Sequence, residues 1–219
     1  MLPTIALHTL ALLSACGSAP DRSVNGDPDA DWPSLPELDQ KITDVMESDG
    51  VAGLAACIID GGEVVWCGGY GQANPDSGML ATPSTPFMLA SVSKAVTGMA
   101  VMQAVEDGAL GLDDPINDHL SFQVTHPDAP GADITTRQVM AHTSGIVDNW
   151  DALETHYVTG DSEEALGDFL QGYLVPGGVD YDALENFHPD GVGQVTEYSN
   201  SGAALAGYMV EAATGTPFD

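Results

Sequence analysis

The strongest pattern of apolar positions lies in residues 87–115 and predicts one long helix. The small apolar residues Ala100, Val101 and Ala104 lie on most of the remaining faces of this helix. We therefore expect the helix to be covered on nearly all sides. Gly108 follows Glu106 and Asp107 and marks the expected end of the helix. The positions at helical spacing are Val92, Ala95, Val96, Met99, Met102 and Val105.

A β-hairpin is predicted before this helix. Residues 51–59 and 64–70 are two β-prone runs around the turn signal Asp60-Gly61-Gly62. A short amphipathic helix that starts near Leu38 and ends near Gly50 comes before the hairpin.

The second half of the chain predicts mostly helix and loop. We expect a short helix over 134–142, capped by Thr135 or Thr136, and a final helix over 201–214. Between them, residues 147–195 are acidic and rich in Gly and Pro, with helix expected only near 163–173 and loop around a cleft elsewhere. The fold class is therefore α/β of the α+β type: a small antiparallel sheet beside a mostly helical region.

The chain contains three cysteines, and two of them suit a disulfide. Cys57 and Cys67 lie symmetrically about Gly62, so a three-residue loop centred there places them opposite each other at a distance that can be bridged. An oxidising compartment is then implied. The alternative is two free buried thiols.

The N-terminal segment predicts export. Residues 1–15 contain a short apolar run that ends in Leu13-Ser14-Ala15-Cys16, which resembles a bacterial lipoprotein signal. That resemblance implies cleavage before Cys16, a lipid on Cys16, and a protein anchored to the outside of a bacterial membrane; an ordinary signal peptide is the alternative. Residues 16–36, rich in Asp, Ser, Pro and Gly, are predicted to be a flexible tether, followed by the domain over 37–219.

The charge excludes several classes of partner. The 219 residues include 4 Lys and Arg against 33 Asp and Glu, for a formal net charge of -29. Nucleic acid is excluded because phosphate binding needs a basic surface, and membrane contact is expected only through the lipid on Cys16. The six histidines show no H-x-x-x-H spacing and the cysteines no C-x-x-C spacing, so we expect no metal site and no cofactor.

Candidate chemistry begins at Ser91-Val92-Ser93-Lys94. Residues three apart share a face of a helix, so the Lys94 amine can reach the Ser91 hydroxyl. A serine becomes a nucleophile when a base takes its proton, and a lysine serves as that base if burial or nearby cations favour its neutral form. The alternative is that Ser91 only caps the helix.

A second candidate is Tyr198-Ser199-Asn200, just before the final helix. Taken alone, it is explained by Asn200 as the helix cap and by Tyr198 packing across the helix start.

Together these stretches resemble the serine β-lactamase and penicillin-binding protein superfamily, in particular its class C branch with related DD-peptidases and esterases. The resemblance covers about 38–219 and rests on motifs that occur in the family's order. They are Gly69-Tyr70-Gly71 in the hairpin, the stretch 87–94, Leu112-Asp113-Asp114-Pro115, the stretch 134–145 with His142-Thr143-Ser144-Gly145, and Tyr198-Ser199-Asn200.

The resemblance implies a role for each of these residues. Ser91 would be the acylated nucleophile, and its backbone N–H one donor to the oxyanion. Lys94 and Tyr198 would share proton transfer, and Asn200 would bind the substrate amide or Lys94. The implied reaction transfers an acyl group from a small-molecule, peptide or ester substrate to water. The acidic charge disfavours anionic substrates, which favours an esterase or peptidase over a true β-lactamase.

One departure from the family's pattern is large. Family members carry a third motif, Lys/His-Thr/Ser-Gly, on C-terminal strands that are absent from this sequence. We therefore expect a truncated product with weak or no catalysis as it stands. The alternative function is a non-catalytic surface lipoprotein that retains the scaffold; the oligomeric state is unknown from the sequence.

Overall fold

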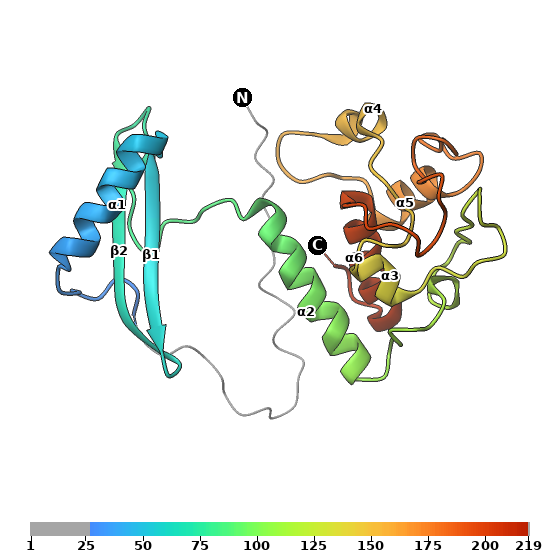
Figure 1. The fold of residues 1–219 in the computed structure, drawn as a ribbon, viewed down its shortest axis with the longest axis horizontal. Helices are drawn as coiled ribbons and strands as arrows, with labels where there is room; N and C mark the ends of the chain where they lie inside the picture. Colours follow the sequence, from blue (N-terminus) through green and yellow to red (C-terminus); the bar gives the residue numbers. More distant parts are fainter. Residues whose placement is uncertain (1–26, 219) are drawn as a thin grey trace. The chain divides into compact units, whose positions relative to one another are not determined.

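The computed structural model describes residues 27–218, which fall into two compact units. The hairpin unit comprises the described residues up to Phe87, and the helical unit those from Met88 onward (Figure 1). The predicted signal peptide, the lipidation site Cys16 and most of the predicted tether lie outside the described residues.

The hairpin unit consists of one helix and a small antiparallel sheet. Helix α1 (Pro36–Asp49) ends at Gly50, whose φ of 69° is the left-handed conformation of a helix stop. Strands β1 (Gly53–Asp60), β2 (Glu63–Asn74) and β3 (Met79–Leu80) follow in the order β1-β2-β3. The predicted helix and hairpin are confirmed, and the sequence did not predict the short third strand.

The turn of the hairpin differs from the expected three-residue loop. Asp60 pairs with Glu63, so the turn has two residues, Gly61 and Gly62, both with positive φ. A two-residue turn by itself would leave Cys57 out of step with Cys67. An irregularity in the register between Ile58 and Ile59 restores the pairing, and Cys57 lies opposite Cys67.

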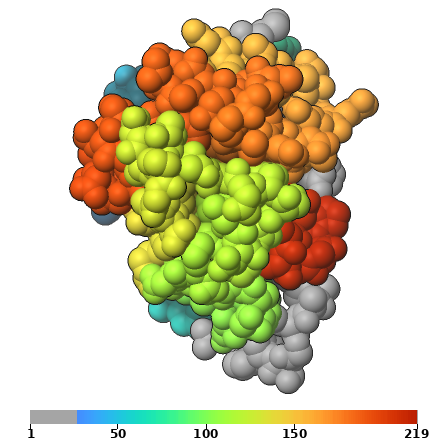
Figure 2. Space-filling view, turned by 90° about the vertical axis from the view of Figure 1, so that its right-hand side faces the viewer, coloured from blue at the N-terminus to red at the C-terminus, as the bar shows by residue number. Residues whose placement is uncertain are grey.

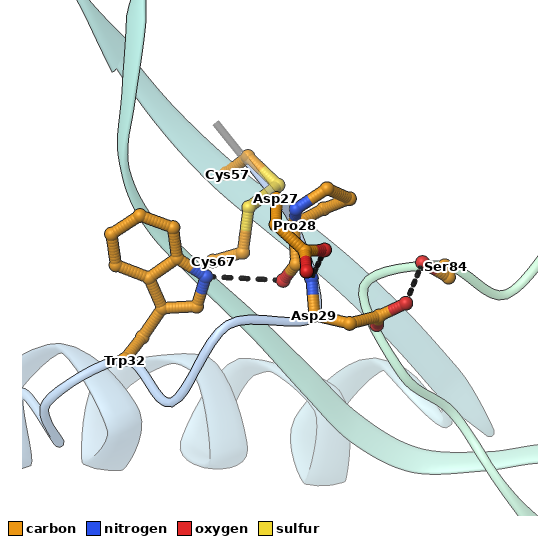
Figure 3. The surroundings of a disulfide bond; sticks show 7 residues. All are labelled: Asp27, Pro28, Asp29, Trp32, Cys57, Cys67 and Ser84. Carbon is orange, nitrogen blue, oxygen red and sulfur yellow. Dashed lines mark hydrogen bonds between the residues drawn. A yellow bond between two sulfur atoms is a disulfide. The ribbon is translucent and has the colours of Figure 1, made fainter. Parts of the chain in front are cut away.

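The predicted disulfide is confirmed. Cys57 and Cys67 are bonded, with their Cα atoms 4.1 Å apart. Figure 3 shows that the segment before α1 passes close to this disulfide. There Trp32 Nε1 donates to the Pro28 carbonyl at 3.1 Å, and the Ser84 hydroxyl donates to the Asp29 carboxylate. The bond from Ser84 to Asp29 ties the segment ahead of α1 to the loop after the sheet, and the bond from Trp32 to Pro28 lies within that segment.

The helical unit is built around α6 (Asn200–Thr214). Helices α2 (Ser93–Glu106), α3 (Thr136–Met140) and α5 (Leu166–Leu174) pack against it, and α4 (Trp150–Leu153) precedes α5. Single 3-10 turns lie at Ala90–Val92, Ile116–Asp118 and Glu154–His156. The core contains Leu205 and Met209 of α6 with Val101 of α2 and Leu170 of α5, all fully buried. The helices expected near 134–142, 163–173 and 201–214 are confirmed, with shorter bounds for the first two.

The expectation that α2 is covered on nearly all sides is wrong. Only Val101 and Ala104 of this helix are buried, whereas Met99 is 64% and Met102 49% exposed. The sequence pattern showed that every face of the helix is apolar, but such a pattern does not tell which faces find a partner.

Irregular structure covers much of the helical unit. In the space-filling view of Figure 2, residues of the acidic segment 147–195, coloured yellow-orange to orange, occupy the upper part of the face, above the green segment that follows α2. Within the described residues, no helix is both long and apolar enough to span a bilayer.

Candidate active site

Ser91 lies in a 3-10 turn immediately before α2. Ala90 has a φ of 45°, a conformation that residues with a side chain rarely adopt, and such strain is typical of functional positions. Val92 occupies the N-cap position of α2, and no side chain caps this helix. The capping alternative for Ser91 is therefore wrong, and its hydroxyl is exposed at the helix entrance.

The structure brings Ser91 together with Lys94 and Tyr198. The Tyr198 hydroxyl donates to Ser91 Oγ at 2.6 Å, across 107 residues of sequence. The Lys94 amine donates to the same oxygen over a longer distance of 3.4 Å, and its Nζ lies 4.8 Å from the centroid of the Tyr198 ring. The serine is thus in contact with two groups that can accept its proton when deprotonated.

Asn200 completes the group, although not as the helix cap that its position suggested. Ser199 caps α6, because its side chain accepts from the Gly202 N–H at 2.8 Å. The Asn200 side chain is consequently free to accept from Lys94 Nζ at 2.6 Å. All four predicted residues therefore lie at one place, where α2 and α6 begin.

The carboxylate of Asp148 organises the start of α6. It accepts four hydrogen bonds, from Ser199 Oγ, the Asn200 N–H, Asn200 Nδ2 and the Ser201 N–H, at 2.7 to 3.2 Å. Because Asp148 holds the amide nitrogen of Asn200, the amide oxygen points toward Lys94. Asp148 thus fixes which end of Asn200 faces the site.

His142 supports Tyr198 from the other side. Its ring lies 4.8 Å from that of Tyr198, and its Nδ1 accepts from the Ser199 N–H at 3.2 Å. Burial, followed by the charge of Lys94, lowers the pKa of His142, which favours the neutral ring that this acceptor role requires. The sequence analysis named His142 only within the motif His142-Thr143-Ser144-Gly145 and assigned it no role at the site.

The electrostatics of the site favour Tyr198 as a base. The Lys94 amine is the largest cause that lowers the pKa of Tyr198, followed by the hydrogen bond with Ser91. A lowered phenol pKa makes the phenolate more accessible near neutral pH, and a phenolate 2.6 Å from Ser91 Oγ can accept its proton.

The described residues contain no group of three or more His, Cys, Asp or Glu side chains placed to hold a metal ion. The donors at the site are one amine, one phenol and one amide, which suit hydrogen bonding and proton transfer.

Asp148 and His142 are the residues at the site to which the sequence analysis assigned no role. Asp148 is one of 33 acidic residues, and no motif distinguishes it from the others. His142 directly precedes Thr143-Ser144-Gly145, and its φ of 56° lies in the left-handed region that residues with a side chain rarely adopt. The proximity of both to Asn200 depends on tertiary structure.

The family model and the curated relatives point to the same family of proteins. The model of the beta-lactamase family matches residues 38–219. "Protein flp" of Staphylococcus aureus strain N315 is 30% identical over 113 residues, which are 52% of this chain and 23% of that protein. "Putative penicillin-binding protein PbpX" of Bacillus subtilis strain 168 is 26% identical over 84% of this chain and 40% of its own length.

Solved structures show the same fold. An octameric penicillin-binding protein homologue from Pyrococcus abyssi superposes with a TM-score of 0.63 and 25% identity, covering 85% of this chain and 40% of that one. A class C beta-lactamase superposes with a TM-score of 0.61 and 20% identity, and the match covers 83% of this chain and 44% of the beta-lactamase. The chain therefore spans less than half the length of each of these four relatives.

Proposed function

The chain belongs to the beta-lactamase family, and from that premise we propose that it is a serine hydrolase that forms an acyl-enzyme on Ser91. The observation that carries the proposal is the convergence of Tyr198 and Lys94 on Ser91 Oγ, at 2.6 and 3.4 Å, from two helix starts distant in sequence. A serine with a positioned base is the minimal unit of nucleophilic acyl transfer.

The proposed reaction has two steps. Ser91 Oγ attacks the carbonyl carbon of the substrate and passes its proton to the Tyr198 phenolate. The bond between the acyl carbon and the leaving group then breaks, and the leaving group takes that proton from Tyr198. In the second step Tyr198 takes a proton from a water, whose oxygen attacks the acyl carbon. The ester bond to Ser91 Oγ then breaks, Ser91 Oγ takes the proton back from Tyr198, and the acid is released.

Lys94 and Asn200 act on this chemistry through charge and position. Lys94 stabilises the Tyr198 phenolate, and Asn200 holds the amine in place through its side-chain oxygen at 2.6 Å. We assign Asp148 as a positioning residue, because it contacts Asn200 and not the reacting serine.

The proposed substrate is a neutral ester or amide. A formal charge of -29 repels anions, and only salt would screen that repulsion. This favours a neutral acyl donor over a β-lactam that carries a carboxylate.

The test is covalent labelling followed by intact mass. The protein is incubated with p-nitrophenyl propionate and, separately, with a fluorescent penicillin. We expect one propionyl adduct, which Ser91→Ala abolishes. Ser93→Ala is the matched control, because it removes a hydroxyl in the same turn and should label like the unaltered protein. An adduct that survives Ser91→Ala contradicts the proposal. A protein lengthened to include strands with the Lys/His-Thr/Ser-Gly motif that still never labels supports the alternative of a non-catalytic scaffold.

A further inference from the structure

Helix α5 carries a fully buried tyrosine. Tyr173 is 0% exposed and is the largest of the fully buried side chains among the described residues. Burial is the main cause that raises the pKa of its phenol, so the hydroxyl keeps its proton and can donate a hydrogen bond. A phenylalanine would fill the same space without the cost of burying a polar group. The partners of the Tyr173 hydroxyl therefore indicate what the phenol contributes.

Those partners are the two residues on either side of Asp148. The Tyr173 hydroxyl donates to the Val147 carbonyl at 2.8 Å and accepts from the Asn149 N–H at 2.6 Å. These three consecutive residues belong to no helix or strand, so no regular ladder of backbone bonds fixes their course. One phenol oxygen thus holds the backbone on both sides of the carboxylate that organises the start of α6.

A buried asparagine holds the same segment through other atoms. Asn186 is 0% exposed, its backbone carbonyl accepts from the Val147 N–H at 3.0 Å, and its side-chain oxygen accepts from Asn149 Nδ2 at 3.0 Å. Asn186 Nδ2 donates to the carbonyl of Tyr173 at 2.8 Å and to that of Asp180 at 2.7 Å. Tyr173 and Asn186 therefore form one hydrogen-bonded frame around this segment.

Building on the proposed hydrolase function, we propose that Tyr173 is a positioning residue of the reaction and acts through Asp148. Asn186 completes the frame that holds Asp148 in place. Asp148 keeps its bonds to the start of α6 only while its backbone stays there, because a hydrogen bond requires both its distance and its angle. Asp148 in turn holds the amide nitrogen of Asn200 at 2.7 Å, and the Asn200 oxygen holds the Lys94 amine at 2.6 Å.

The first test is Tyr173→Phe, which removes only the hydroxyl and keeps the ring in the core. We expect labelling of Ser91 by p-nitrophenyl propionate to slow by about 10-fold, since a misplacement of about 1 Å can cost about 100-fold and the bonds from Asn186 remain. Tyr208→Phe is the matched control. It removes a phenol hydroxyl of the same unit, which bonds Ser121 Oγ at 3.0 Å, and should label like the unaltered protein.

A double variant shows whether the phenol acts through Asp148. In the Asp148→Ala background, Tyr173→Phe should slow labelling by less than about 2-fold, because the carboxylate that it positions is already absent. A larger further slowing would mean that Tyr173 acts by another route, such as a general loss of stability, and would overturn the proposal.

A titration of Tyr198 gives a readout that needs no labelling. The Lys94 amine is the largest cause that lowers the pKa of Tyr198. If Asn200 rotates, it releases Lys94 from its place beside the phenol, so Tyr173→Phe should raise the pKa of Tyr198 toward that of an ordinary phenol. Tyr208→Phe should leave this pKa unchanged. It is followed by NMR of protein isotopically labelled at tyrosine Cζ, with Tyr198→Phe to assign the signal.

Equal labelling rates of Tyr173→Phe and Tyr208→Phe, or an unchanged titration of Tyr198 in Tyr173→Phe, overturn the positioning role and leave the acyl-enzyme on Ser91 untouched. Absence of labelling in every variant and in the lengthened protein refutes the hydrolase. The titration of Tyr198 then decides by itself whether Tyr173 positions the group at the start of α6.

Discussion

The two units of this protein are stabilised in different ways. In the hairpin unit few apolar side chains are buried, among them Met46 and Trp66, while Ile59 and Leu80 are more than half exposed; a disulfide links its two long strands. The helical unit has a continuous core from Val101 to Val210 with no disulfide among its described residues. All the proposed site residues lie in the helical unit, so the chemistry should depend on core packing and hydrogen bonds and not on the covalent link.

The largest expected effect is on the core of the helical unit. Leu205 is fully buried in α6, five residues after Asn200. Leu205→Ala removes three carbons and leaves a cavity, and we expect it to lower the free energy of unfolding by about 3 to 4 kcal/mol. Thermal and denaturant unfolding measure the loss. Leu184→Ala is the matched control, because Leu184 is 80% exposed and its loss should cost less than about 0.5 kcal/mol. A similar loss at both positions would mean that the core does not stabilise this unit.

The next effect is on the rate of acylation. Asp148→Ala removes the acceptor of four hydrogen bonds and lets the Asn200 amide rotate, and we expect labelling of Ser91 to slow by about 100-fold. Asp148→Asn keeps one acceptor oxygen and should slow it less. The rates come from intact mass over time with p-nitrophenyl propionate.

The control for this experiment is Asp151→Ala, which removes an exposed carboxylate in the first turn of α4. Its expected cost is at most about 1 kcal/mol of stability, with no change in the labelling rate. If Asp148→Ala labelled as fast as Asp151→Ala, Asp148 would have no positioning role.

Loss of the disulfide should destabilise only the hairpin unit. Cys57 and Cys67 are 10 residues apart, and closing a loop of that length contributes about 2.7 kcal/mol in the chain-entropy account. We therefore expect Cys57→Ser with Cys67→Ser to raise hydrogen exchange in β1 and β2 while labelling of Ser91 keeps its rate. Loss of labelling in this double variant would show that the two units are coupled, against the comparison drawn above.

The sequence predicted the helices, the strands and the disulfide better than it predicted helix burial, helix capping and turn length. The hairpin, the disulfide and the grouping of Ser91, Lys94, Tyr198 and Asn200 were predictable because β-prone runs, paired cysteines and short motifs are local signals. The exposed face of α2 was not, since an all-apolar helix carries no information on which face is covered. The role of Ser199 as cap was missed because Ser199 and Asn200 are equally good caps, and only the contact with Lys94 decides between them. The two-residue turn was missed because a register irregularity compensates for it.

The smallest expected effect is a pH dependence of the ion pairs that His156 makes. His156 bonds Glu164 at 2.8 Å and Asp180 at 2.9 Å. Burial lowers the pKa of His156, but the hydrogen bonds to Asp180 and Glu164 outweigh it and raise the pKa above 6.5. A raised pKa in the folded state means that the ion pairs contribute fully below about pH 6.5, the unfolded value, and that the contribution is lost as pH rises through the folded value.

Since these ion pairs join His156 to Glu164 and Asp180, their loss should loosen the segment 156–164 at alkaline pH. We expect hydrogen exchange there, corrected for its intrinsic pH dependence, to increase as pH rises above 6.5. His156→Gln should flatten this curve. His188→Gln, at a histidine that lies 3.8 Å from the exposed carboxylate of Asp190, should leave it unchanged. Equal corrected exchange in this segment at pH 6 and pH 9 would mean that His156 does not hold the segment in place.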